Sequence, residues 1–134
     1  MTKEEKAHAL LQEAFQLDAR GREAEAIPLY RRALRLGLPK EEKKHALIGL
    51  ASSLRNVGQL PEARRVIERA RHAYKDDPAI AAFYALILHD LGESKQALKA
   101  LGQAYLAHVR DPRLFEYERP LARKFRALGK KKRR

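Results

Sequence analysis

Apolar residues recur at intervals of three and four along most of this sequence, and polar residues occupy the positions between them. This spacing places the apolar side chains on one face of an α-helix. The alternating runs of Val, Ile and Thr that mark strands are nearly absent, and the chain contains no Asn-Gly or Asp-Gly turn. The pattern therefore predicts an all-α protein.

Helix start and stop signals divide the pattern into seven predicted helices. Thr2 and Glu5 form a capping box at the start of the first helix. Gly21, Gly58 and Gly92 each follow the last apolar residue of a helix, where a residue tolerant of positive φ is favoured. We expect helices over about residues 3–20, 22–36, 40–57, 61–74, 78–91, 94–109 and 112–128.

Three further residues carry expectations about individual helices. Pro28 should bend the second helix without ending it, because the apolar stripe continues in phase on both sides. Ser94 is expected to cap the sixth helix. Pro120 is expected to kink the last helix or to split it into a short first piece and a second piece over residues 122–128.

The sequence also repeats itself, since residues 44–77 can be laid over residues 78–111 with almost no adjustment. The glycines that end the matching helices, Gly58 and Gly92, lie 34 residues apart. A looser copy covers about residues 7–40, with 37 residues between its glycine and the next. The positions that match between the two closest copies are Leu47, Leu50, Ala51, Leu54, Ala63, Ile67 and Ala70, and then Ala81, Tyr84, Ala85, Leu88, Ala97, Leu101 and Ala104.

A period of 34 residues, with small residues where helices must approach closely, resembles the tetratricopeptide repeat. Residues 45–128 also resemble a bacterial adaptor-like group of tetratricopeptide proteins, through the segment 82–92 and Tyr117. The resemblance implies a right-handed α-solenoid of three antiparallel helical hairpins with a C-terminal capping helix at about 112–128. It also implies one domain over residues 1–128, a basic tail at 129–134, and the binding of another macromolecule.

Two sets of residues are expected to form the core, because one hairpin cannot bury its apolar stripe alone. Small residues should lie where helices cross closely, and larger residues should fill the space between them. The small residues are Ala14, Ala26, Ala51, Ala63, Ala85 and Ala97, and the larger ones are Leu17, Tyr30, Leu54, Ile67, Leu88 and Leu101.

The first helices of the hairpins are expected to line a concave surface with an apolar strip, beside which small Gly49, Ser52 and Ala82 should leave depth. A surface of this kind suits a helix or peptide of a partner protein. Two alternatives stay open: two copies of the chain bury the strip against each other, or a terminal helix covers it. The predicted partner-binding residues are Leu11, Phe15, Ile48, Ser52, Arg55, Phe83, Leu86 and His89.

The charge of the chain is concentrated at its C-terminal end. The net charge is +12, and +8 of it lies from Arg113 onward. The predicted contacts for phosphate or an acidic partner are Lys130, Lys131, Lys132, Arg133 and Arg134. Non-specific binding of nucleic acid or a ribonucleoprotein is therefore the alternative function, and a purely solubilising role is the other interpretation of these charges.

Several classes of function lack their usual sequence signals. The chain contains no Cys, and its five His residues show no metal-binding spacing, so neither a cofactor nor a metal is expected. There is no glycine-rich phosphate loop and no nucleophile beside a base, so we expect no enzymatic activity. No run approaches the 18 apolar residues of a membrane span, and we expect a cytoplasmic protein without membrane contact.

Overall fold

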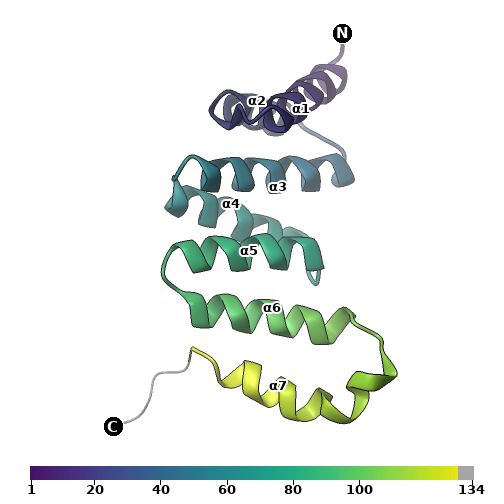
Figure 1. Cartoon of the computed structure of the whole chain (residues 1–134). Helices are drawn as coiled ribbons and strands as arrows, with labels where there is room; N and C mark the ends of the chain where they lie inside the picture. Colours follow the sequence, from purple (N-terminus) through teal and green to yellow (C-terminus); the bar gives the residue numbers. More distant parts are fainter. Residues whose placement is uncertain (130–134) are drawn as a thin grey trace. The chain divides into compact units, whose positions relative to one another are not determined.

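The computed structural model describes residues 1–129, and these form helices and no strand (Figure 1). The all-α prediction is confirmed. The elements are α1 (Lys3–Ala19), α2 (Glu23–Leu36), α3 (Lys40–Asn56), α4 (Leu60–Ala73), α5 (Pro78–Asp90), α6 (Ser94–His108), the 3₁₀ helix η1 (Pro112–Tyr117) and α7 (Glu118–Ala127).

The chain divides into two compact units, the first over Met1–Tyr74 and the second from Lys75 onward. In the first unit, α1 and α2 form one hairpin, α3 and α4 form another, and α2 and α1 both pack against α3. In the second unit, α6 lies between α5 and α7, and packs on each of them (Figure 1). Whether the repeats work as one domain over residues 1–128 stays a prediction.

Local signals set the ends of the helices as expected. The Thr2 hydroxyl accepts a hydrogen bond from the Glu5 amide at 3.1 Å, and the Glu5 carboxylate accepts one from the Thr2 amide at 3.4 Å. Gly58 and Gly92 follow α3 and α5 with φ of 85° and 83°, a backbone conformation that costs glycine little. Helix α2 is continuous across Pro28, so this proline does not end it.

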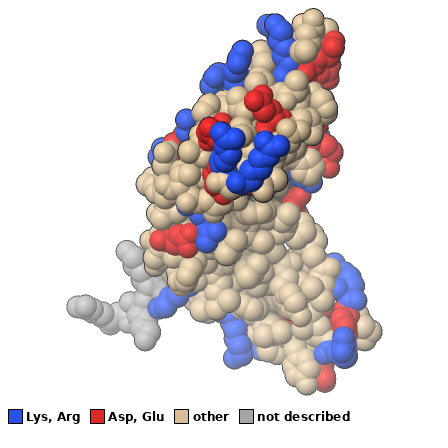
Figure 2. Space-filling model, turned by 45° about the horizontal axis from the view of Figure 1, so that its top comes forward, with Lys and Arg blue, Asp and Glu red and all other residues tan. Residues whose placement is uncertain are grey.

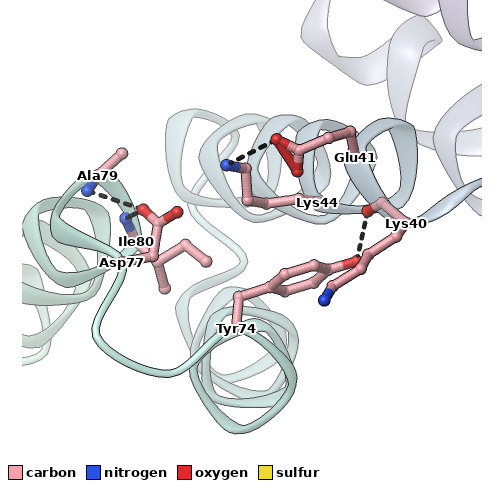
Figure 3. Close-up of polar contacts among 7 residues, drawn as sticks. All are labelled: Lys40, Glu41, Lys44, Tyr74, Asp77, Ala79 and Ile80. Carbon is pink, nitrogen blue, oxygen red and sulfur yellow. Dashed lines mark hydrogen bonds and ion pairs between the residues drawn. The ribbon is translucent and has the colours of Figure 1, made fainter.

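The junctions on either side of residue 75 are fixed by different contacts (Figure 3). The Tyr74 hydroxyl donates to the Lys40 carbonyl at 2.7 Å, which ties the end of α4 to the start of α3. The Asp77 carboxylate accepts from the amides of Ala79 and Ile80 at 2.9 and 3.1 Å. Asp77 therefore caps α5, where the first amides of a helix have no acceptor inside it.

Two expectations about the C-terminal part were wrong. Glu93, and not Ser94, occupies the cap position of α6, and Ser94 is the first residue of the helix. The last predicted helix is divided, but the division falls between Tyr117 and Glu118, where η1 gives way to α7. Pro120 lies in the first turn of α7, and a proline is tolerated there because the amide it lacks would have no helical acceptor.

Most of the predicted core is buried, including all six alanines at the helix crossings. Tyr30, Leu54, Ile67 and Leu88 are buried as well, and Leu17 is half-buried. Leu101 was predicted to be core but is 45% exposed. The reason lies in the packing around α6, which is described below.

Candidate functional site

The residues predicted to bind a partner fall in both units, so the two groups are described separately. In the first unit, Leu11 is only 1% exposed and belongs to the core. The expectation that it lines an open surface was wrong, because α2 and α3 both pack close to α1. Phe15, Ile48, Ser52 and Arg55 are half-buried.

Phe15 contributes to packing within the first unit. Its ring meets the Tyr30 ring edge to face, with 5.9 Å between the centroids and 63° between the planes. Such pairs contribute about 0.5–1.5 kcal/mol beyond the area they bury. Phe15 is therefore a packing residue that keeps part of its ring available at the surface.

Gly49 does not leave the depth that was expected beside the strip. A Cβ atom at this position would lie 2.6 Å from Cζ of Tyr30. The space beside Gly49 is therefore filled by the Tyr30 ring, which reaches from α2 to α3. The small residue serves close packing between two helices, and the expectation of a hollow here was wrong.

The Asp18 carboxylate joins three helices in the first unit. It accepts a hydrogen bond from the Tyr30 hydroxyl on α2 and another, at 2.7 Å, from the Ser53 hydroxyl on α3. Burial and the bond to Asp18 raise the pKa of Tyr30 well above its ordinary value. Ser53 is 1% exposed, and sequence analysis did not single it out. The hydroxyls of Tyr30 and Ser53 both donate to Asp18, so this network serves to hold α1, α2 and α3 together.

A surface depression of about 630 Å³ lies beside the start of α1. It borders the pair formed by His8 and Glu42, whose Nδ1 and Oε2 atoms are 3.1 Å apart. The depression is lined by Met1, Thr2, Glu4, Glu5, His8, Pro39 and Glu42. Across the described residues, no three His, Cys, Asp or Glu side chains are arranged to share a metal ion.

In the second unit, the predicted binding residues are more accessible. Leu86 is 44% exposed, His89 is exposed, and Phe83 is half-buried. Nδ1 of His89 lies 3.0 Å from the hydroxyl oxygen of Ser94. This bond links the end of α5 to the first turn of α6.

Helix α6 carries three exposed apolar side chains in one row, which we call the α6 stripe: Leu98, Leu101 and Tyr105. Their exposed fractions are 51%, 45% and 51%, and their spacing of three and four residues puts them on one face. Ser94, which contacts His89, lies one turn before Leu98 on the same face of α6.

The arrangement of the neighbouring helices explains why this stripe is open. In the first unit α1 packs against α3, and Tyr30, which matches Leu101 in the repeat, is fully covered. In the described part of the second unit, α5 and α7 each pack on α6 but not on each other. Helix α7 is placed by Phe125, which fills the space beside Gly102. Helix α7 therefore covers Gly102 and leaves Leu101 exposed.

Helix α6, which carries the stripe, and helix α7, which packs on it, hold few acidic side chains, although Asp90, Glu93, Asp111 and Glu116 lie in the adjoining segments. Helix α6 contains Lys95 and Lys99 and no Asp or Glu, and α7 carries Glu118 as its one acidic residue. The exposed cations of α7 are Arg119, Arg123, Lys124 and Arg126. In the lower part of Figure 2, uncharged residues cover a broad area, and charged side chains lie mostly at its margins. Lys130 to Arg134 lie outside the described residues.

Helices of membrane-spanning length and apolarity do not occur in the part of the chain that the structure describes. No curated protein matches the sequence. Among solved structures, the fold is similar to that of SycD, a type III secretion translocator chaperone of Yersinia enterocolitica crystallised as an alternative dimer. The TM-score is 0.65 at 16% sequence identity, and the alignment covers 91% of this chain and 92% of that one.

The family comparison agrees with the repeat pattern. The family described as Tetratrico peptide repeat matches residues 7–129, which is nearly the whole chain. The matched range extends through α7. With helical hairpins in both units and this match across them, the chain belongs to the tetratricopeptide repeat family.

Proposed function

We propose that this protein is a non-catalytic adaptor that holds a segment of another protein against exposed apolar side chains of its helices. The α6 stripe is the observation that carries the proposal. Three neighbouring apolar side chains, each about half exposed, form the kind of surface that marks a partner site. Family membership supports this function, because stacked helical repeats present extended binding surfaces.

The partner-binding residues predicted from the sequence, apart from the buried Leu11, enter the proposal unit by unit. In the first unit they are Phe15, Ile48, Ser52 and Arg55, and in the second they are Phe83, Leu86 and His89. A role as a chaperone for a secreted protein is compatible with the proposal, since the similar structure is of a translocator chaperone. A cytoplasmic location is part of the same proposal.

Affinity capture from the native lysate tests this function. The tagged chain is used as bait after nuclease treatment and at about 0.2 M salt, where non-specific nucleic-acid contacts are weak. We expect the chain to retain the same protein in repeated captures. The variant Leu98→Glu should lose that protein while keeping its helicity and melting temperature, because Leu98 is half exposed.

Two outcomes would speak against the adaptor. One is that no protein is retained in repeated captures. The other is that nucleic acid co-purifies at this salt concentration and is lost from a variant lacking residues 130–134, which would favour the alternative function of the basic tail.

A further inference from the structure

We propose that the α6 stripe binds an amphipathic helix whose polar face is acidic. This inference rests on the adaptor function and names the chemistry of the partner. Leu98, Leu101 and Tyr105 span about 10 Å along α6, which is the length of two helical turns. A partner helix with apolar residues at positions i, i+3 or i+4, and i+7 presents a matching row.

The position of the stripe favours a helix over an extended strand. A strand needs free backbone donors and acceptors at the edge of a sheet, and the described residues form only helices. A helix satisfies its own backbone bonds and needs only an apolar ridge to pack against. With α5 on one side of α6 and α7 on the other, a third helix laid along the stripe would complete the packing around α6.

The charges on α6 and α7 indicate which side chains the polar face of the partner helix should carry. Helices α6 and α7 together contain six Lys and Arg residues and one acidic residue, Glu118. After the end of α6, Arg113 pairs with Asp111, with 2.7 Å between Nη2 and Oδ2. Phe125, which fixes α7 on α6, stands between Lys124 and Arg126 in the sequence. Acidic side chains flanking the apolar row of a partner would therefore meet mainly cationic side chains on α6 and α7.

The same charges argue against a second copy of this chain as the occupant. Two copies that meet through α6 would bring Lys95 and Lys99, and the cations of α7, close to their own counterparts. Like charges placed across an interface are unfavourable, and each chain carries a net charge of +12. An acidic partner removes this repulsion and replaces it with attraction.

Two synthetic peptides of 15 residues, the length of α6, test the inference directly. Both carry Leu at the same apolar positions, and their polar positions hold Glu in one peptide and Lys in the other. Binding of each fluorescently labelled peptide to the full chain is measured by anisotropy at about 0.05 M salt, where surface charges are little screened. We expect the acidic peptide to bind at least about tenfold more tightly than the basic one.

Variants locate the binding on the stripe. Leu101→Glu should lower the affinity for the acidic peptide about tenfold, because the substitution removes a central apolar contact and adds a negative charge that repels the peptide. Val57→Glu is the matched control, since Val57 is another exposed apolar residue, on the first unit, and its change should leave the affinity within about twofold. If circular dichroism shows that Leu101→Glu does not fold, Leu98→Gln takes its place.

Four results would overturn the inference. They are equal affinity for both peptides, no binding of either, an unchanged affinity in the stripe variant, and a dimer in sedimentation that the stripe variant dissociates. The last would assign the surface to a second copy of the chain. If lysate capture retains a protein while both peptides fail, the adaptor function stands and this inference fails.

Discussion

The ring of Tyr30 occupies the space that any side chain at position 49 would need, since a Cβ atom on Gly49 would lie 2.6 Å from the ring. The ring is fully buried and is held by the bond from its hydroxyl to Asp18, so it has little freedom to withdraw. This contact joins the first hairpin to the second. Because of this contact, the packing requires glycine at position 49, although this position lies inside a helix.

Gly49→Ala should therefore destabilise the protein, although alanine is the better helix former by about 1 kcal/mol. Overpacking against a buried ring costs about 1–3 kcal/mol, which is larger than the gain in helix propensity. Urea unfolding measures the difference. Ser52→Ala, three residues further along α3 and half-buried, is the control and should change stability by less than about 0.5 kcal/mol. A more stable Gly49→Ala variant would show that the Tyr30 ring moves aside.

The raised pKa of Tyr30 predicts how stability depends on alkaline pH. Burial and the bond to Asp18 favour the neutral hydroxyl in the folded state, while an unfolded tyrosine ionises near pH 10. The unfolded state then holds fewer protons than the folded state, so stability falls as pH rises above about 10. Melting temperatures measured from pH 8 to about 11 should show this loss.

Tyr30→Phe should flatten that pH dependence, because phenylalanine has no proton to release. Tyr117→Phe provides the control, since Tyr117 is 55% exposed. If the two variants lose stability equally steeply above pH 10, the alkaline transition does not come from Tyr30.

The two hydroxyls that bond to Asp18 should be energetically coupled. Ser53→Ala removes one bond to the carboxylate and should cost about 0.5–1.5 kcal/mol. In a double-mutant cycle with Tyr30→Phe, we expect a coupling energy of at least about 0.5 kcal/mol, because the residues share one partner. Additive losses of stability would mean that each hydroxyl bonds to Asp18 independently of the other.

Ala85 tests the packing of the second unit. It is 6% exposed and lies in a cluster with Leu88, Ala97 and the half-buried Tyr84. Ala85→Leu should cost about 1–3 kcal/mol in urea unfolding, because the crossing of α5 and α6 has no room for the larger side chain. Ala107→Leu, at an exposed position on α6, should be close to neutral. A neutral Ala85→Leu would contradict the close crossing.

The helices could be predicted because their signals are local. Gly58, Gly92 and the Thr2 capping box each act within a few residues, and all are found where the sequence placed them. The alanines at the crossings could be predicted as well, because their places recur with the repeat. These signals do not depend on how one hairpin meets the next.

The errors concern residues whose environment depends on a neighbouring hairpin. Leu101 occupies the same repeat position as the buried Tyr30. The exposure of Leu101, however, depends on where α7 packs, and Phe125 of α7 packs against Gly102 instead. Leu11 and Gly49 were assigned to an open surface because the sequence does not show how closely α1, α2 and α3 meet.

The polar contacts between hairpins did carry a usable signal. Asp18 and Ser53 are 35 residues apart, and His8 and Glu42 are 34 apart. These separations equal or nearly equal the repeat period. Pairing polar residues 34 apart would therefore have found Glu42 as a partner of His8, whereas for Asp18 it points to Ser52, the neighbour of the actual partner Ser53.

The position of Asp18 has a consequence for how the chain unfolds. Repeat proteins often lose their terminal repeats first, because each repeat is stabilised only by its neighbours. Here a carboxylate near the end of α1 accepts hydrogen bonds from one hydroxyl on α2 and another on α3, so α1 cannot detach without breaking both bonds. The first two hairpins should therefore behave as one cooperative block, with amide protons of α1 and α3 exchanging at similar free energies and no early fraying from the N-terminus.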